Sequence, residues 1–109
     1  MRSLDPSAPT IFLELCIMKQ LQRVQVIYSG YVQGVGFRFA AKRIASVIGV
    51  TGFVENLPNG NVLIVAEGMQ NQLESFIADL KKRMSDYISD SCVEWQTATG
   101  EFETFEIKF

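Results

Sequence analysis

The spacing of hydrophobic residues changes several times along the chain, and each spacing predicts one element. Alternation over residues 24–28 predicts a strand, because successive side chains of a strand point to opposite faces. Apolar residues three or four apart predict amphipathic helices at 39–48 and 73–84. The same reasoning predicts four more strands, at 50–55, 61–67, 93–96 and 104–109.

This order of elements predicts the fold class. Strand, helix, strand, strand, helix and strand (βαββαβ) is the split βαβ pattern of a ferredoxin-like α+β sandwich, here with an added closing strand. We expect two helices on one face of a mostly antiparallel sheet. In that topology the first and second strands run parallel with the third between them. Their C-terminal ends therefore emerge at the same edge.

The start of the chain differs from the rest. Residues 1–17 contain two prolines and no usable period, and their apolar stretch at 11–17 is interrupted by Glu14. A membrane span needs about 20 apolar residues, and no clear secretory signal is present. We expect residues 1–17 to be a disordered extension and residues 18–109 to form one domain.

Composition excludes several classes of function. A net charge of -2 and a pI near 5.0 argue against binding to nucleic acid or an anionic membrane. The chain has no histidine, which excludes a histidine-ligated zinc site and a Ser-His or Cys-His nucleophile. Cys16 and Cys92 lack metal-ligand spacing. We expect both to be free thiols, which fits the cytoplasm, with a Cys16–Cys92 bridge as the alternative. We also expect a monomer.

A glycine-rich connection between the first strand and the first helix is the candidate site. Gly30, Gly34 and Gly36 free the backbone there, so the amides and the dipole of the helix start can face an anion. Arg38 follows at the helix start, and its planar fork suits phosphate or carboxylate. The spacing matches neither G-x-x-x-x-G-K-[ST] nor G-x-G-x-x-G. A tight connection without a ligand therefore fits this loop equally well.

Two segments resemble the signature motifs of the acylphosphatase family: GYVQGVGFR at residues 30–38 and TGFVENLPNG at 51–60. The resemblance extends over roughly residues 21–109. It implies hydrolysis of a small-molecule acyl phosphate, with inorganic phosphate as product and without metal, cofactor or covalent intermediate. An acyl phosphate has a carboxylate leaving group, so a strong general acid is not required.

The resemblance also implies roles for individual residues. Arg38 is expected to bind phosphate and Asn56 to orient the attacking water, for which a rigid amide with donor and acceptor is suited. The alternative for Asn56 is a hydrogen bond within its own turn. The predicted substrate-binding residues are Gln33, Gly34, Val35, Gly36, Phe37 and Arg38.

Other charged and aromatic residues depart from this picture or lie outside it. Tyr31 and Glu55 stand where family members commonly carry basic residues, and we expect them to flank the anion site and to weaken it or change the acyl group accepted. Lys42 and Arg43 are expected on a solvated face, and the basic cluster at 81–83 is expected to complement the dipole at its helix end. The aromatic residues are expected in the core or at the sheet edge.

Two alternative functions remain open from the sequence. The first is a non-catalytic ferredoxin-like module that binds a small anion or a protein partner. The second is an RNA-recognition domain, since residues 36–39 loosely imitate a Gly-Phe-x-Phe element. That element would have to lie on a central strand, whereas here it spans a loop and a helix start in an acidic chain.

Overall fold

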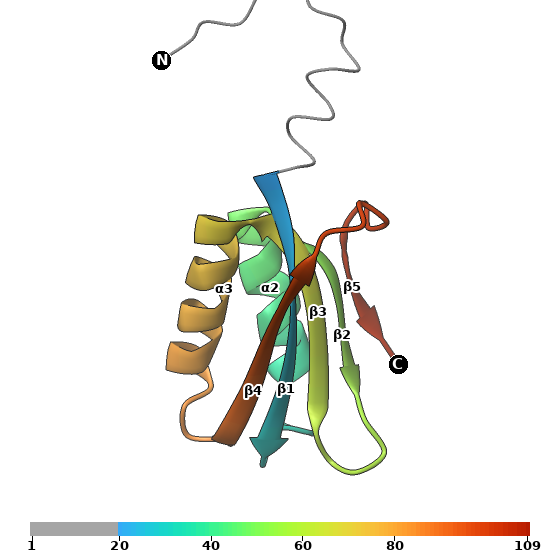
Figure 1. Ribbon diagram of the computed structural model, residues 1–109. Helices are drawn as coiled ribbons and strands as arrows, with labels where there is room; N and C mark the ends of the chain where they lie inside the picture. The colour runs from blue at the N-terminus through green and yellow to red at the C-terminus, as the bar shows by residue number, and fades with distance from the viewer. Residues whose placement is uncertain (1–19) are drawn as a thin grey trace, which may run out of the picture.

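Seven helices and strands follow one another in the predicted order in the computed structural model, which describes residues 20–109 (Figure 1). The predicted extension at 1–17 and Cys16 lie outside the described residues. The elements are β1 (Leu21–Gly30), α2 (Phe37–Ile48), β2 (Thr51–Asn56), β3 (Val62–Met69), α3 (Gln70–Arg83), β4 (Ile88–Thr97) and β5 (Phe105–Lys108).

The five strands form one sheet in the order β4-β1-β3-β2-β5. Both β1 and β2 pair antiparallel with β3, so they run parallel to each other, as predicted. The closing strand β5 pairs parallel with β2. The arrowheads of β1, β2 and β5 therefore point toward the same end of the sheet in Figure 1. This end contains the candidate site.

Most element boundaries differ from the predicted ones; strand β4, for example, begins at Ile88, five residues earlier than expected. Helix α2 begins at Phe37, two residues earlier than expected, because Gly36 takes a left-handed conformation (φ 81°) and acts as its N-cap. Arg38 consequently belongs to the first helical turn. Strand β3 continues through Gly68 to Met69, because Gly68 still pairs with Gln22 of β1.

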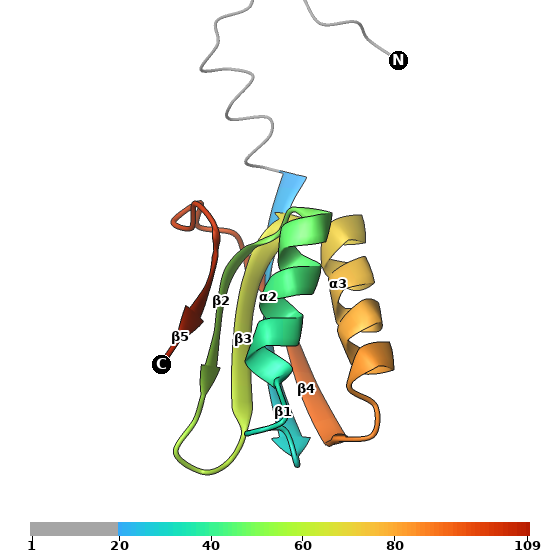
Figure 2. The same ribbon diagram turned by 180° about the vertical axis from the view of Figure 1, so that it is seen from behind.

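Both helices lie on the same face of the sheet, which confirms the predicted sandwich (Figure 2). Helix α3 buries large side chains at Leu73, Phe76 and Leu80, whereas α2 buries Phe37 at its start and then three alanines, at positions 40, 41 and 45. Each fully buried large side chain contributes about 1.5–3 kcal/mol to folding. The core between helices and sheet thus fixes the start of α2 against the ends of β1 and β2.

Some aromatic residues lie in the core or at the sheet edge, as expected, whereas Phe39 on α2 is 63% exposed and Tyr31 in the glycine-rich loop is 84% exposed. Phe76 and Phe105 pack in the core with ring centroids 5.7 Å apart. Trp95 lies on the edge strand β4 and is 43% exposed. Neither helix of residues 20–109 is long and apolar enough to cross a membrane.

Candidate active site

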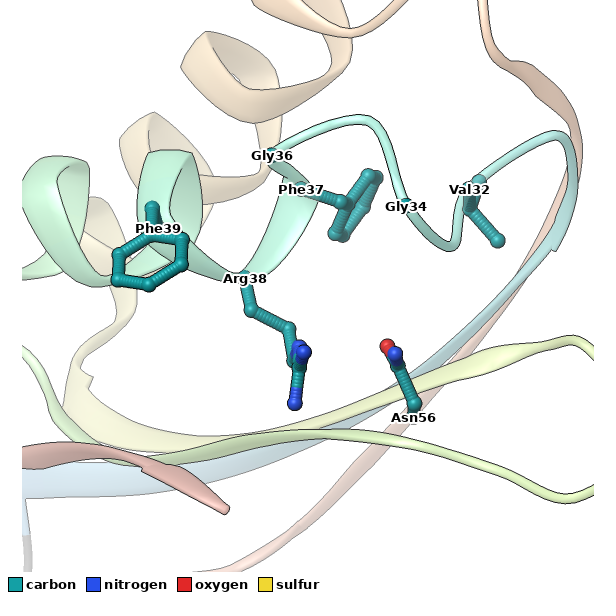
Figure 3. A pocket seen from close by; sticks show the side chains of 7 residues that line it. All are labelled: Val32, Gly34, Gly36, Phe37, Arg38, Phe39 and Asn56. Carbon is teal, nitrogen blue, oxygen red and sulfur yellow. The ribbon is translucent and has the colours of Figure 1, made fainter. Parts of the chain in front are cut away.

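A cavity of about 250 Å³ lies where β1 and β2 end and α2 begins (Figure 3). Residues from the glycine-rich loop, the first turn of α2 and the end of β2 line it: Val32, Gly34, Gly36, Phe37, Arg38, Phe39 and Asn56. The cavity brings Arg38 and Asn56 together despite their separation in sequence. This juxtaposition follows from the parallel direction of β1 and β2.

The loop over the cavity depends on its glycines and on one aromatic anchor. Gly34 (φ 77°) and Gly36 (φ 81°) occupy left-handed conformations, which cost other L-residues about 1–2 kcal/mol. Phe37 is buried, and its ring centroid lies 5.0 Å from that of Tyr28 on β1. Burial also raises the pKa of Tyr28. The loop is thus bent by glycine and fastened to the core by Phe37.

The backbone N–H groups of residues 33–38 donate no hydrogen bond to any residue of the described chain. The first bond of the helix is from the Ala40 amide to the Gly36 carbonyl, at 3.0 Å. Free amides in a loop and first helical turn, at the positive end of the helix dipole, form a binding site for an anion. The geometry therefore matches the anion-binding interpretation of the loop.

Arg38 is held in the cavity by the C-terminal end of β5. Its side chain is half-buried and donates a hydrogen bond from Nη1 to the Lys108 carbonyl at 3.3 Å. Its guanidinium carbon lies 4.9 Å from the ring centroid of Phe109. One hydrogen bond leaves most of the five guanidinium donors available. In Figure 3 the side chain extends from the start of α2 toward the sheet, beside Asn56.

Asn56 ends β2 on the face that the helices cover, opposite Val62 of β3. Its Oδ1 atom is buried and accepts no hydrogen bond from residues 20–109. Leaving a buried acceptor unpaired costs about 1–3 kcal/mol, so such atoms are few; the described residues contain two other buried polar atoms without a partner, Arg23 Nε and the Tyr28 hydroxyl oxygen. The adjoining turn is stabilised instead by Asn59, whose Oδ1 accepts from the Asn61 amide at 3.0 Å.

Two of the predicted substrate-binding residues have side chains outside the cavity. The side-chain amide of Gln33 donates to the carbonyls of Leu57 and Asn61, both at 2.8 Å, and so fastens the loop to the β2–β3 turn. Val35 lines a neighbouring hollow instead. Both residues can contribute only their backbone amides to the cavity. Gly34, Gly36, Phe37 and Arg38 line it as predicted.

The expectation that Tyr31 and Glu55 flank the anion site is wrong. Neither side chain lines the cavity. Tyr31 is 84% exposed. Glu55 precedes Asn56 on β2, and adjacent strand residues point to opposite faces of the sheet. Glu55 therefore faces away from the helices, in register with Lys108 of β5.

The sequence interpretation missed the residues that hold Arg38 in place. Lys108 and Phe109 were assigned to a closing strand whose position in the sheet was not predicted. Parallel pairing of β5 with β2 carries them to the end of the sheet where the cavity lies. The signal that could have found them is the position of these two residues at the C-terminal end of that strand.

The groups around the cavity suit an anion and not a cation. Its polar groups are backbone amides, a guanidinium and one side-chain amide. Within residues 20–109, no three His, Cys, Asp or Glu side chains are grouped so that they could hold a metal ion. The fold is that of a ferredoxin-like α+β protein, and a cavity whose lining suits an anion lies at the end of its sheet.

Comparison with known proteins gives the family. The acylphosphatase family model matches residues 24–107. An acylphosphatase of Syntrophotalea carbinolica is 40% identical over 88 residues, which span 80% of this chain and 96% of the relative. An acylphosphatase of Thermotoga petrophila is 37% identical over 82% of this chain and 99% of its own. The crystal structure of acylphosphatase from Bacillus subtilis aligns with a TM-score of 0.74 and 30% identity, over 81% of this chain and 99% of that one.

The chain belongs to the acylphosphatase family. It is an enzyme that hydrolyses acyl phosphates to a carboxylate and inorganic phosphate. This assignment decides against the non-catalytic module and the RNA-recognition domain as the function of the chain.

Proposed function

We propose that the amides of residues 33–38 and Arg38 hold the phosphoryl group of the acyl phosphate, while Asn56 positions the water that attacks it. The observation that supports this proposal is that residues with unbonded amides (Gly34, Gly36, Phe37 and Arg38) line one cavity with Asn56. The side-chain oxygen of Asn56 is unpaired within residues 20–109. Phosphoryl transfer requires chiefly positioning and charge stabilisation from a protein, and these groups supply both.

The reaction follows from this arrangement as an in-line displacement. The Asn56 Oδ1 accepts a hydrogen from water and directs the water oxygen at phosphorus. A bond forms between the water oxygen and phosphorus while the bond from phosphorus to the acyl oxygen breaks. The acyl group leaves as a carboxylate, and the water proton passes to the phosphate product and solvent. The loop amides and Arg38 stabilise the charge on the three phosphoryl oxygens throughout.

Substitution of Arg38 tests the binding half of this proposal. Arg38→Gln should lower kcat/KM for benzoyl phosphate by roughly 2–4 kcal/mol of transition-state stabilisation, because a charge-assisted fork is lost. Competitive inhibition by inorganic phosphate should be lost with it. Lys42→Gln removes a positive charge from an exposed position of the same helix and should change neither quantity. Wild-type turnover in Arg38→Gln would contradict the proposed role.

We also propose that the reaction needs no metal ion. The support is chemical: N–H donors and a guanidinium attract anions and repel cations, and the sequence contains no histidine. Dialysis against a chelator should leave the rate of benzoyl phosphate hydrolysis unchanged. A loss of rate that added Mg²⁺ or Zn²⁺ restores would show that a metal takes part.

The cellular location, the oligomeric state and the lack of macromolecular partners are proposed chiefly from the sequence. We propose a cytoplasmic monomer that binds neither nucleic acid nor membrane: the net negative charge disfavours both polyanionic partners, and the exposed thiol of Cys92, which is free within residues 20–109, fits a reducing compartment. Size-exclusion chromatography and cell fractionation test the two parts separately.

A further inference from the structure

A second hollow, of about 240 Å³, adjoins the cavity on the other side of Gly36. Gly36 and Phe39 line both spaces. Arg43 of α2 and Arg83 of α3 line the second hollow but not the first, because antiparallel packing brings the end of α3 beside the start of α2 (Figure 2). A molecule bound by the loop amides therefore has an adjacent space that two cations border.

The surroundings of the two arginines include the Asp79 carboxylate, which lines a third hollow together with Arg83. Neither arginine forms an ion pair or a side-chain hydrogen bond within the part of the chain that the structure describes, and no acidic residue lines the second hollow. By contrast, Arg23 pairs with two carboxylates, and Arg38 bonds a carbonyl. In a chain with a net charge of -2, two unpaired cations over one hollow form a local positive site.

The position of this hollow fits the departing half of the substrate. In an in-line displacement the attacking water and the leaving oxygen lie on opposite sides of phosphorus. Asn56 and Arg38 border the first cavity and are absent from the second. Arg38 and Arg43 are five residues apart, so they leave the helix roughly 140° apart around its axis. The leaving acyl group is thus directed away from Asn56 and toward Arg43.

We infer that this second hollow binds the acyl group and that Arg43 and Arg83 select acyl groups carrying a second negative charge. The inference rests on the proposed function, which places the phosphoryl group on the loop amides. Val35, Met84 and the exposed Phe39 supply apolar surface for the carbon skeleton. A carboxylate or phosphate at the far end of the acyl group binds to the two guanidinium groups, because a guanidinium can donate two parallel hydrogen bonds to either anion.

A matched pair of substrates tests the inference. Benzoyl phosphate and 4-carboxybenzoyl phosphate share a ring and a leaving carboxylate, and they differ by the distal carboxylate alone. The measured quantity is the ratio of kcat/KM for the charged substrate to that for the neutral one. We expect the wild-type ratio to be about 10 or more at low salt and to fall as salt screens the arginines.

Single substitutions of the arginines should reduce this preference. Arg43→Gln and Arg83→Gln should each lower the ratio about 3-fold to 5-fold, and the double variant should bring it near one. Both side chains are exposed, so the variants should fold normally. Lys42→Gln removes an equal charge outside the hollow and should leave the ratio within about 1.5-fold of the wild type.

Three results would overturn the inference: a wild-type ratio near one, an unchanged ratio in the double variant, or an equal fall in Lys42→Gln. Failure of the proposed function is distinguishable, because it appears as undiminished turnover of both substrates in Arg38→Gln. The ratio of the two substrates is measured in the wild type and the arginine variants whether or not Arg38 has its proposed role.

Discussion

Polar side-chain atoms are buried at both ends of the sheet, and the carboxylate of Glu67 and the side-chain oxygen of Asn56 differ in their hydrogen bonding. Where β1 begins, the Glu67 carboxylate is 3% exposed and accepts hydrogen bonds from Arg23, Thr99 and Gly100. Where β1 and β2 end, the buried oxygen of Asn56 accepts none from residues 20–109. Buried polar groups in folded proteins are normally paired. The paired residue therefore has a structural role, whereas the unpaired one remains available to substrate and water.

The end of the sheet that contains Glu67 also supports the end that contains Asn56. Thr99 and Gly100 lie in the connection between β4 and β5, which returns the chain from one edge of the sheet to the other (Figure 1). The Glu67 carboxylate fixes this connection through bonds of 2.9–3.0 Å. Strand β5 follows this connection, and the carbonyl of its last residue, Lys108, accepts the hydrogen bond from Arg38. A structural residue at one end thus helps to place a functional residue at the other.

The largest effect on stability is expected from Glu67→Ala. It leaves Arg23 without its buried partner and several donors of the connection without an acceptor, so the free energy of unfolding should fall by roughly 3–5 kcal/mol. Under conditions where the variant is folded, the pairing of β5 with β2 still places Lys108 beside Arg38, so kcat for benzoyl phosphate should stay within about threefold of the wild type. Denaturant unfolding and steady-state kinetics measure the two quantities.

The matched control is Glu94→Ala, which removes an exposed carboxylate from β4. Its free energy of unfolding should change by less than about 0.5 kcal/mol. The distinction between the two ends fails if Glu67→Ala is equally harmless, or if it abolishes turnover while the protein remains fully stable.

The sequence predicted the parts of the molecule that depend on local pattern and on a simple rule of topology. The periods of hydrophobic residues gave the order of elements, and the parallel direction of the first two strands placed Arg38 near Asn56. Alternation along β2 would also have placed Glu55 away from the site, so that error was avoidable.

Other parts of the site depend on packing between distant segments. Residues 98–104 have no period, so the bonds from their amides to Glu67 could not be predicted. The choice of β2 as the partner of β5, and with it the support of Arg38, likewise depends on how the connection crosses the sheet. The pairing state of the Asn56 oxygen depends on which donors the folded chain brings within reach.

The smallest expected effect is on the free energy of unfolding at low pH, and it concerns the Arg23–Glu101 pair at the end of the sheet that contains Glu67. A hydrogen bond from Arg23, at 2.6 Å, holds the pKa of the exposed Glu101 carboxylate below its ordinary value of 4.5. A lowered pKa stabilises the folded protein above the unfolded-state pKa, and this stabilisation is lost as the pH falls through the folded-state value.

Glu101→Gln tests this contribution. The difference in free energy of unfolding between wild type and variant should be constant from neutral pH down to about 4.5 and should shrink at lower pH. Urea unfolding at a series of pH values measures it. A difference that grows as the solution becomes more acidic would contradict the assignment of the Arg23–Glu101 pair.

The central claim, that the unpaired Asn56 oxygen orients water while other groups bind phosphate, is tested most directly by Asn56→Ala. Its kcat for benzoyl phosphate should fall roughly 100-fold or more, because the water loses its position. The inhibition constant of inorganic phosphate should stay within about threefold, since the loop amides and Arg38 are intact. Asn59→Ala, in the adjoining turn, should keep wild-type kcat. Wild-type kcat in Asn56→Ala, or a collapse of its phosphate affinity, would contradict the claim.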